Sequence, residues 1–106
     1  MLVNNPNMVE IPDIIALALA ARNCVDRIYL HWTAGHYGQF YDDYHFNIDK
    51  DGTVYQTCEN LCESKSHTWQ RNRRSIGIAL ACGYGASVSV PLGTCEKMLY
   101  GVKAGV

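Results

Sequence analysis

Residues 75–82 constrain the fold more than any other segment of this 106-residue sequence. They read SIGIALAC, a nearly continuous run of small and apolar side chains, and the glycines Gly83 and Gly85 come soon after it. Such a run, without the alternation of a half-exposed strand, is typical of a strand that is covered on both faces. The segment therefore predicts a central strand in a sheet against which other parts of the chain pack.

A second segment predicts a β-hairpin. Residues 44–49 alternate between aromatic or apolar side chains and polar ones, and residues 53–56 resume the strand pattern. Asp51 and Gly52 lie between the two runs, and this dipeptide is favoured in tight hairpin turns because both central residues must tolerate positive φ. We expect the two strands to pair around this turn.

A helix is expected from Pro12 to about Ala21. Proline is tolerated in the first turn of a helix, and the acidic Glu10 and Asp13 suit the positive end of the helix dipole. Residues 28–32 are rich in β-branched and aromatic side chains and predict a strand.

The length leaves room for one domain, spanning residues 1–106. Residues 1–9 are polar and without pattern, so we expect a loose arm there, and residues 96–102 have the composition of one or two further helical turns. The predicted fold class is α/β, or α+β in layers, with a mixed central sheet and flanking helices.

Composition excludes several classes of protein. Apolar residues make up 48% and charged residues 18%, which indicates a globular chain. A net charge of −1 gives no field that would attract nucleic acid or an anionic membrane. The basic cluster Arg71, Arg73 and Arg74 fits a solvated loop as well as a binding role.

Cysteine usage and the apolar run at residues 14–21 bear on the compartment. Five cysteines at irregular spacing do not resemble a secreted disulfide framework, so we expect reduced thiols in a cytoplasmic fold. No Lys or Arg precedes the apolar run, which argues against a signal peptide, and its eight residues are far fewer than the roughly 20 that span a bilayer. We therefore expect cytoplasmic synthesis without membrane insertion.

Three segments follow one another in the order residues 28–35 (IYLHWTAG), residues 44–55 (YHFNIDKDGTVY) and residues 67–72 (HTWQRN), the last followed by residues 75–80. Together they resemble the zinc-dependent N-acetylmuramoyl-L-alanine amidase family, which includes phage lysozyme-type amidases and peptidoglycan-recognition proteins. The first segment is similar to the family's strand that ends in a zinc histidine, the second to its tyrosine-bearing hairpin, and the third to its substrate-side segment and central strand. The resemblance covers residues 27–83.

The resemblance implies hydrolysis of the amide between muramic acid and L-alanine in peptidoglycan, with a zinc ion as cofactor and peptidoglycan or a muropeptide as partner. A zinc ion lowers the pKa of bound water to about 7 and polarises the carbonyl, which an unreactive amide needs. His31 matches the first zinc ligand. Without the resemblance, a histidine in an apolar strand is more often a structural residue.

The resemblance also implies roles for other side chains. Tyr44 matches the tyrosine whose hydroxyl orients the water or donates to the oxyanion. His67, Asn72, Trp69 and Thr33 match substrate-side positions, although Thr33 also suits a simple cap of the turn after the strand. Because side chains alternate along a strand, we expect His45 on the face opposite Tyr44, away from the metal.

The other zinc ligands of the family have no match here. They lie beyond a further helix, whereas only 24 residues follow Cys82 and none is histidine. We therefore expect a domain truncated at the C-terminus, which either has lost activity or is completed by a second chain.

Two other functions stay open. One is a non-catalytic peptidoglycan-binding module, or an inactive prophage remnant, that keeps the groove residues without the metal. The other is a small structural zinc site made by Cys58, Cys62 and His67, for which the sequence offers no clear fourth ligand.

Overall fold

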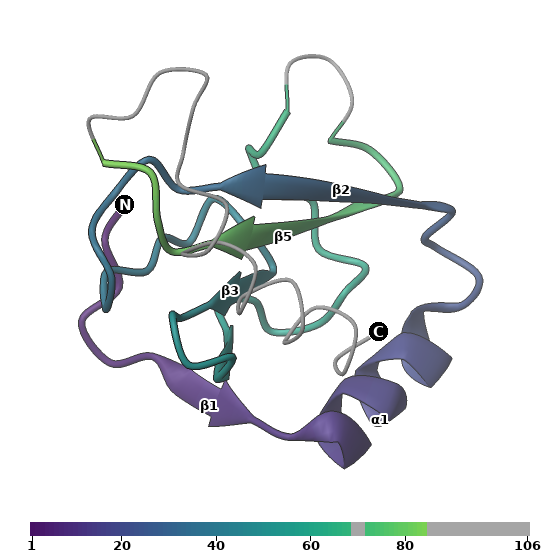
Figure 1. Cartoon of the computed structure of the whole chain (residues 1–106). Coiled ribbons are helices and arrows are strands. Elements are labelled where there is room, and N and C mark those ends of the chain that lie inside the picture. The colour runs from purple at the N-terminus through teal and green to yellow at the C-terminus, as the bar shows by residue number, and fades with distance from the viewer. Residues whose placement is uncertain (69–71, 85–106) are drawn as a thin grey trace.

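A mixed five-stranded sheet forms the centre of this computed structural model, which describes residues 1–68 and 72–84 (Figure 1). The strands are β1 (Asn7–Val9), β2 (Arg27–Trp32), β3 (Phe46–Ile48), β4 (Val54–Gln56) and β5 (Ser75–Leu80), and the helix α1 spans Ile11–Ala21. The strand order is β1-β4-β3-β5-β2. This arrangement confirms the predicted mixed sheet in an α+β fold.

Strand β5 lies inside the sheet, as its apolar sequence predicted. It pairs in parallel with β2 on one side and with β3 on the other, and all six of its residues are buried. The register places Ile28 beside Ile76 and Leu30 beside Ile78. These side chains belong to the face of the sheet on which α1 lies.

Helix α1 covers part of that face through its buried Ile14 and Ala21. The helix begins where expected: the backbone N–H of Glu10 donates to Asp13 Oδ2 at 2.9 Å, which satisfies one donor at the start of the helix. An apolar cavity of about 120 Å³ lies between α1 and the sheet and is lined by side chains that include Ile15, Ile28, Phe46 and Ile78. No helix in the described ranges is long and apolar enough to cross a membrane.

The hairpin of β3 and β4 is confirmed, but its turn is longer than expected. The Gly52 N–H donates to the Asp49 carbonyl at 2.9 Å, and the Asp49 N–H donates to the Thr53 carbonyl at 3.0 Å. Of the turn residues, Gly52 alone has a positive φ, at 86°. Asp51 keeps a negative φ and instead accepts the Thr53 N–H with its carboxylate. Glycine is therefore required at position 52 only.

The loose arm expected over residues 1–9 is wrong. Strand β1 pairs antiparallel with β4, and the terminal ammonium group of Met1 lies 2.7 Å from a carboxylate oxygen of Asp42. Asn7 and Met8 remain exposed in this edge strand because the pairing uses backbone groups, and only Val9 is buried.

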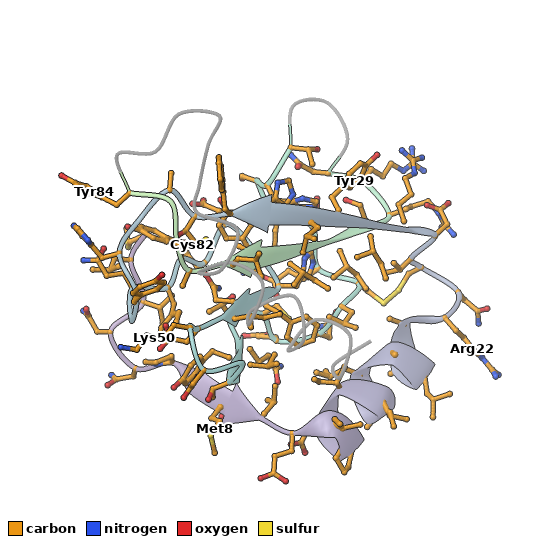
Figure 2. The ribbon with its side chains drawn as sticks, in the orientation of Figure 1. Met8, Arg22, Tyr29, Lys50, Cys82 and Tyr84 are labelled. Atoms are coloured by element: carbon orange, nitrogen blue, oxygen red, sulfur yellow. A yellow bond between two sulfur atoms is a disulfide. The ribbon has the colours of Figure 1, made fainter. Side chains whose placement is uncertain are left out.

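The expectation of reduced thiols is also wrong for two cysteines. Cys24, after α1, and Cys62, after β4, form a disulfide (Figure 2). The bond ties the end of the helix to the long segment that leads to β5. Cys58 lies nearby in sequence and is not in a disulfide.

Candidate active site

The face of β2 that points away from α1 carries Tyr29 and His31. Side chains alternate along a strand, so these two rings share one face while Ile28 and Leu30 share the other. Figure 2 shows Tyr29 on the side of β2 away from the helix. On the neighbouring β5, Gly77 pairs with Tyr29 and Ala79 with His31. These small residues leave room above the central strand for side chains from other segments.

His67 and Tyr44 enter this space from different parts of the chain. His31 Nε2 lies 2.9 Å from His67 Nδ1, and the ring centroids of His31 and Tyr44 are 5.4 Å apart. Tyr29 lies 5.9 Å from His67 by the same measure. Three of the residues named from the sequence, His31, Tyr44 and His67, are therefore brought together in one cluster.

The position of His67 is tightly determined. Its Nε2 lies 2.9 Å from Ser75 Oγ, and its ring packs on the bare backbone of Gly77. A Cβ atom at position 77 would lie 2.6 Å from His67 Cγ, which is closer than real contacts allow. Glycine at this position of the buried strand therefore allows the imidazole to lie close to the backbone. Neither Ser75 nor Gly77 was singled out from the sequence, although a glycine inside a strand signals such an approach.

Asn72 holds the loop that carries His67. Its side-chain oxygen accepts the backbone N–H of His67 at 3.1 Å and that of Thr68 at 2.7 Å. Thr33 caps the turn after β2, because its hydroxyl oxygen accepts the Gly35 N–H at 3.1 Å. Both residues thus have a structural task, and their contact with substrate stays a prediction. Trp69 lies outside the described residues, as do Arg71 and residues 96–102.

His45 is not on a distant face, as the alternation had suggested. It is fully buried, and its ring centroid lies 5.9 Å from that of His67. Its Nδ1 accepts the Gly77 N–H, and its Nε2 donates to the Glu63 carbonyl. The alternation failed because β3 begins only at Phe46, after both Tyr44 and His45. With both ring nitrogens engaged by backbone groups, His45 is a structural residue.

A comparison with protein families matches residues 21–98 to N-acetylmuramoyl-L-alanine amidase, which is more than half of the chain. The chain belongs to this amidase family. The matched range contains β2, β3, β4 and β5, and with them His31, Tyr44 and His67. No curated protein and no solved structure matches the chain.

The residues that the structure describes do not form a complete metal site. Within residues 1–68 and 72–84, no group of three or more His, Cys, Asp or Glu side chains is arranged to hold a metal ion. The alternative site made by Cys58, Cys62 and His67 is wrong, because Cys62 is bonded to Cys24 and His67 bonds to His31 and Ser75. The described residues therefore do not by themselves fit a zinc ion.

Burial controls the charge of the amidase cluster. It lowers the pKa of His31, and it lowers that of His67 to about 4, with further lowering by the neighbouring His31 and His45. Burial also raises the pKa of Tyr44, and the nearby Asp43 adds to this. At neutral pH the cluster consists of neutral imidazoles and a protonated phenol, so its ring nitrogens and hydroxyl are available as hydrogen-bonding groups and ligands.

These shifts predict that the amidase loses stability on mild acidification. The pKa of His67 is about 4 in the fold and about 6.5 in an unfolded chain, so between these values the unfolded state binds more protons. The stability is complete above pH 6.5 and falls as the pH drops towards 4. From pH 7 to pH 5 we expect the free energy of unfolding to decrease by about 2 kcal/mol through His67, with His31 and His45 acting in the same direction.

Urea unfolding at a series of pH values measures this effect. The variant His67→Asn should flatten the dependence. A wild-type stability that is constant from pH 7 to pH 5 would contradict the prediction.

Proposed function

We propose that this amidase hydrolyses the amide between the lactyl group of N-acetylmuramic acid and L-alanine in bacterial peptidoglycan, with zinc as cofactor. The observation that supports it best is the cluster of His31, Tyr44 and His67 on one face of β2 and β5, in a chain of this family. An imidazole at the end of a strand is held rigidly, which suits a metal ligand. The proposed site of action is the cell wall, reached after release from the cytoplasm.

The proposal assigns a chemical role to two residues of this chain, His31 and Tyr44. In the proposal His31 would be one ligand of a zinc ion, which would supply activation of water and polarisation of the carbonyl. Tyr44 keeps its proton, since its pKa is raised, and its hydroxyl donates a hydrogen bond to the oxygen that becomes negative as the amide is attacked. The remaining metal ligands would come from residues beyond 84 or from a second chain.

The test is the release of new L-alanine amino termini from purified peptidoglycan, with and without a zinc chelator. Release should stop with the chelator and in His31→Ala, where we expect a loss larger than the roughly 10–100-fold that follows removal of a second-shell partner. His36→Ala is the matched control, because this histidine is exposed and stacks on Tyr84 outside the cluster. Folded protein that releases no termini under any condition would refute the enzyme proposal.

A second candidate function is peptidoglycan binding without hydrolysis. It is favoured by the lack of a three-ligand metal group among residues 1–68 and 72–84, together with His67 and Asn72, to which the resemblance assigns a substrate-side role. Sedimentation of the protein with insoluble peptidoglycan separates the two functions. Binding that persists in the chelator, without release of amino termini, supports the binding module.

A further inference from the structure

We propose that the Cys24–Cys62 disulfide is a redox switch for the candidate site: the closed bond holds the segment that fixes His45, and reduction by a thiol releases that segment. The bond joins residues 38 positions apart. The use of such a switch rests on the proposed function, because it concerns a substrate outside the cytoplasm. The structural effect of the switch does not, since it follows from contacts inside the fold.

The disulfide is accessible to small molecules in solvent. Cys62 is exposed, and Cys24 is half-buried in the turn after α1. A disulfide is reduced when a thiolate attacks one of its two sulfurs, so the rate depends on access to a sulfur. Exposed disulfides are for this reason more labile than buried ones. The Cys62 sulfur is therefore the expected point of attack.

The reaction is a two-electron exchange with a low-molecular-weight thiol. The thiolate attacks Cys62 Sγ, the bond between the two protein sulfurs breaks, and Cys24 leaves as a thiolate that takes up a proton. A second thiolate then attacks the mixed disulfide and releases Cys62, which also takes up a proton. Two small thiols are thereby oxidised to one small disulfide, and the protein disulfide is reduced to two thiols. A small disulfide reverses both steps.

Cys58 is a poor competitor in this exchange. It lies four positions before Cys62, and its side chain packs against the hydrophobic core. Burial raises the pKa of the Cys58 thiol to about 11, so almost none of it is thiolate at neutral pH. Because the thiolate is the attacking species, Cys58 reacts slowly with the neighbouring disulfide. The bond between Cys24 and Cys62 thus opens and closes without being exchanged for another pairing.

The residue after Cys62 connects the disulfide to the site. The Glu63 backbone carbonyl accepts a hydrogen bond from Nε2 of His45, which is fully buried. The other ring nitrogen of His45 accepts the Gly77 N–H at 3.0 Å, and the His45 backbone N–H donates to the Gly77 carbonyl at 2.9 Å. The His67 ring rests on the same glycine. Displacement of Glu63 therefore leaves a buried N–H without its acceptor, next to the support of His67.

The same segment also reaches the site at its other end. The Thr57 hydroxyl donates to the Tyr44 backbone carbonyl at 2.6 Å, and the Thr57 N–H donates to the His45 carbonyl at 2.9 Å. Residues 57–63, which we call the tether, are thus bonded at both ends to the pair Tyr44 and His45. Movement of the tether acts on both residues together.

The disulfide is a main attachment of the tether to the rest of the fold. Hydrogen bonds such as that from the Glu59 N–H to the Glu63 carboxylate, at 2.9 Å, lie within the tether and fix its shape but not its position. Leu61 packs into the core, and the disulfide fastens the next residue to the end of α1. When the bond opens, the attachment through Leu61 remains, so we expect local release of the tether while the sheet stays folded.

The switch matches the two compartments of the proposed function. Thiols are kept reduced in the cytoplasm, whereas disulfides form and persist outside it. Peptidoglycan lies outside the cytoplasm. An amidase with this bond would have a loosened site where it is synthesised and an ordered site where its substrate is.

Hydrogen exchange of the full chain, followed for each amide by nuclear magnetic resonance, tests the structural effect. Excess reduced glutathione should remove the protection of the amide N–H groups of His45, Thr57 and Gly77. The amides of Asp49 in the hairpin and Ala81, which bonds to β3, should keep theirs. Protection that persists at all five amides would overturn the proposal. Loss at all five would overturn it as well, because reduction would then unfold the whole sheet.

Variants show which sulfurs respond. The double variant Cys24→Ser with Cys62→Ser should resemble the reduced wild type, whether or not glutathione is present. Cys58→Ala is the matched control and should respond to glutathione as the wild type does. Oxidised glutathione should restore protection to the reduced wild type, which gives the same test without a substitution. A response to glutathione that remains in the double variant would overturn the assignment to this disulfide.

Release of L-alanine amino termini from peptidoglycan tests the use of the switch. The oxidised chain should release termini, and the reduced chain should lose this activity. Equal release in both states would overturn the use of the switch. If neither state releases termini while the His45 amide responds as expected, the proposed function fails and the structural switch stands.

Discussion

Replacing Cys24 with serine should lower the free energy of unfolding by about 4 kcal/mol. The Cys24–Cys62 disulfide joins residues 38 positions apart, and closing a loop of that length removes this much conformational freedom from the unfolded chain. Urea unfolding of the wild type in the presence and absence of a reductant, followed by circular dichroism, measures the same effect without a mutation.

The control for this experiment is Cys58→Ala. Cys58 lies four positions before Cys62 and takes no part in a disulfide, so the variant should keep its sensitivity to the reductant. The reductant should have no further effect on Cys24→Ser. Equal unfolding midpoints for the oxidised and reduced wild type would show that the bond does not constrain the chain.

The variant Gly77→Ala should lose about 3 kcal/mol of stability and most of the order of the candidate site. The added Cβ would lie 2.6 Å from His67 Cγ and 2.9 Å from its Nδ1, so the imidazole must move. Overpacking of a closely packed core costs about 1–3 kcal/mol, and the His31–His67 hydrogen bond is lost in addition. Denaturant unfolding gives the stability, and the ring nitrogen signals of His31 report on the hydrogen bond.

Gly38→Ala is the matched control for a glycine replacement. Gly38 is exposed, has a φ of 74°, and offers nothing within 4 Å of an added Cβ, so only backbone strain of about 1–2 kcal/mol is expected. The His31 signals should remain as in the wild type. If the two variants lose equal stability and Gly77→Ala keeps the His31 signals, the close approach of His67 is not what requires glycine.

Local patterns predicted the parts of the fold that local chemistry determines. The hairpin, helix α1 and the central strand β5 each have a period or a run of side chains that distinguishes them within a short window. Strand β1 has no such pattern, because its strand character comes from pairing with β4, more than 40 positions away along the chain. The disulfide was missed for a related reason, since a count of cysteines says nothing about which two approach in space.

The candidate site was likewise predicted from the sequence only in part. The resemblance to the family identified His31, Tyr44 and His67, and the structure brings them together. It could not show that His67 bonds to His31, because that contact depends on how closely the His67 ring approaches the backbone of Gly77. Asn72 matched a substrate-side position, yet its side-chain oxygen holds the loop, which no spacing rule distinguishes from a binding role.

The place of β5 in the sheet has a consequence for the order in which the chain folds. Among the described strands β5 is the last in sequence, yet it lies between β2 and β3, and β2 pairs with it alone. During synthesis β2 has no partner until residues 75–80 have left the ribosome, while β3 and β4 already form a local hairpin. The contacts of β5 with β2 are long-range, which makes their formation slow. His31 and His67 therefore meet late, and a chain stopped before β5 would have a hairpin but no site.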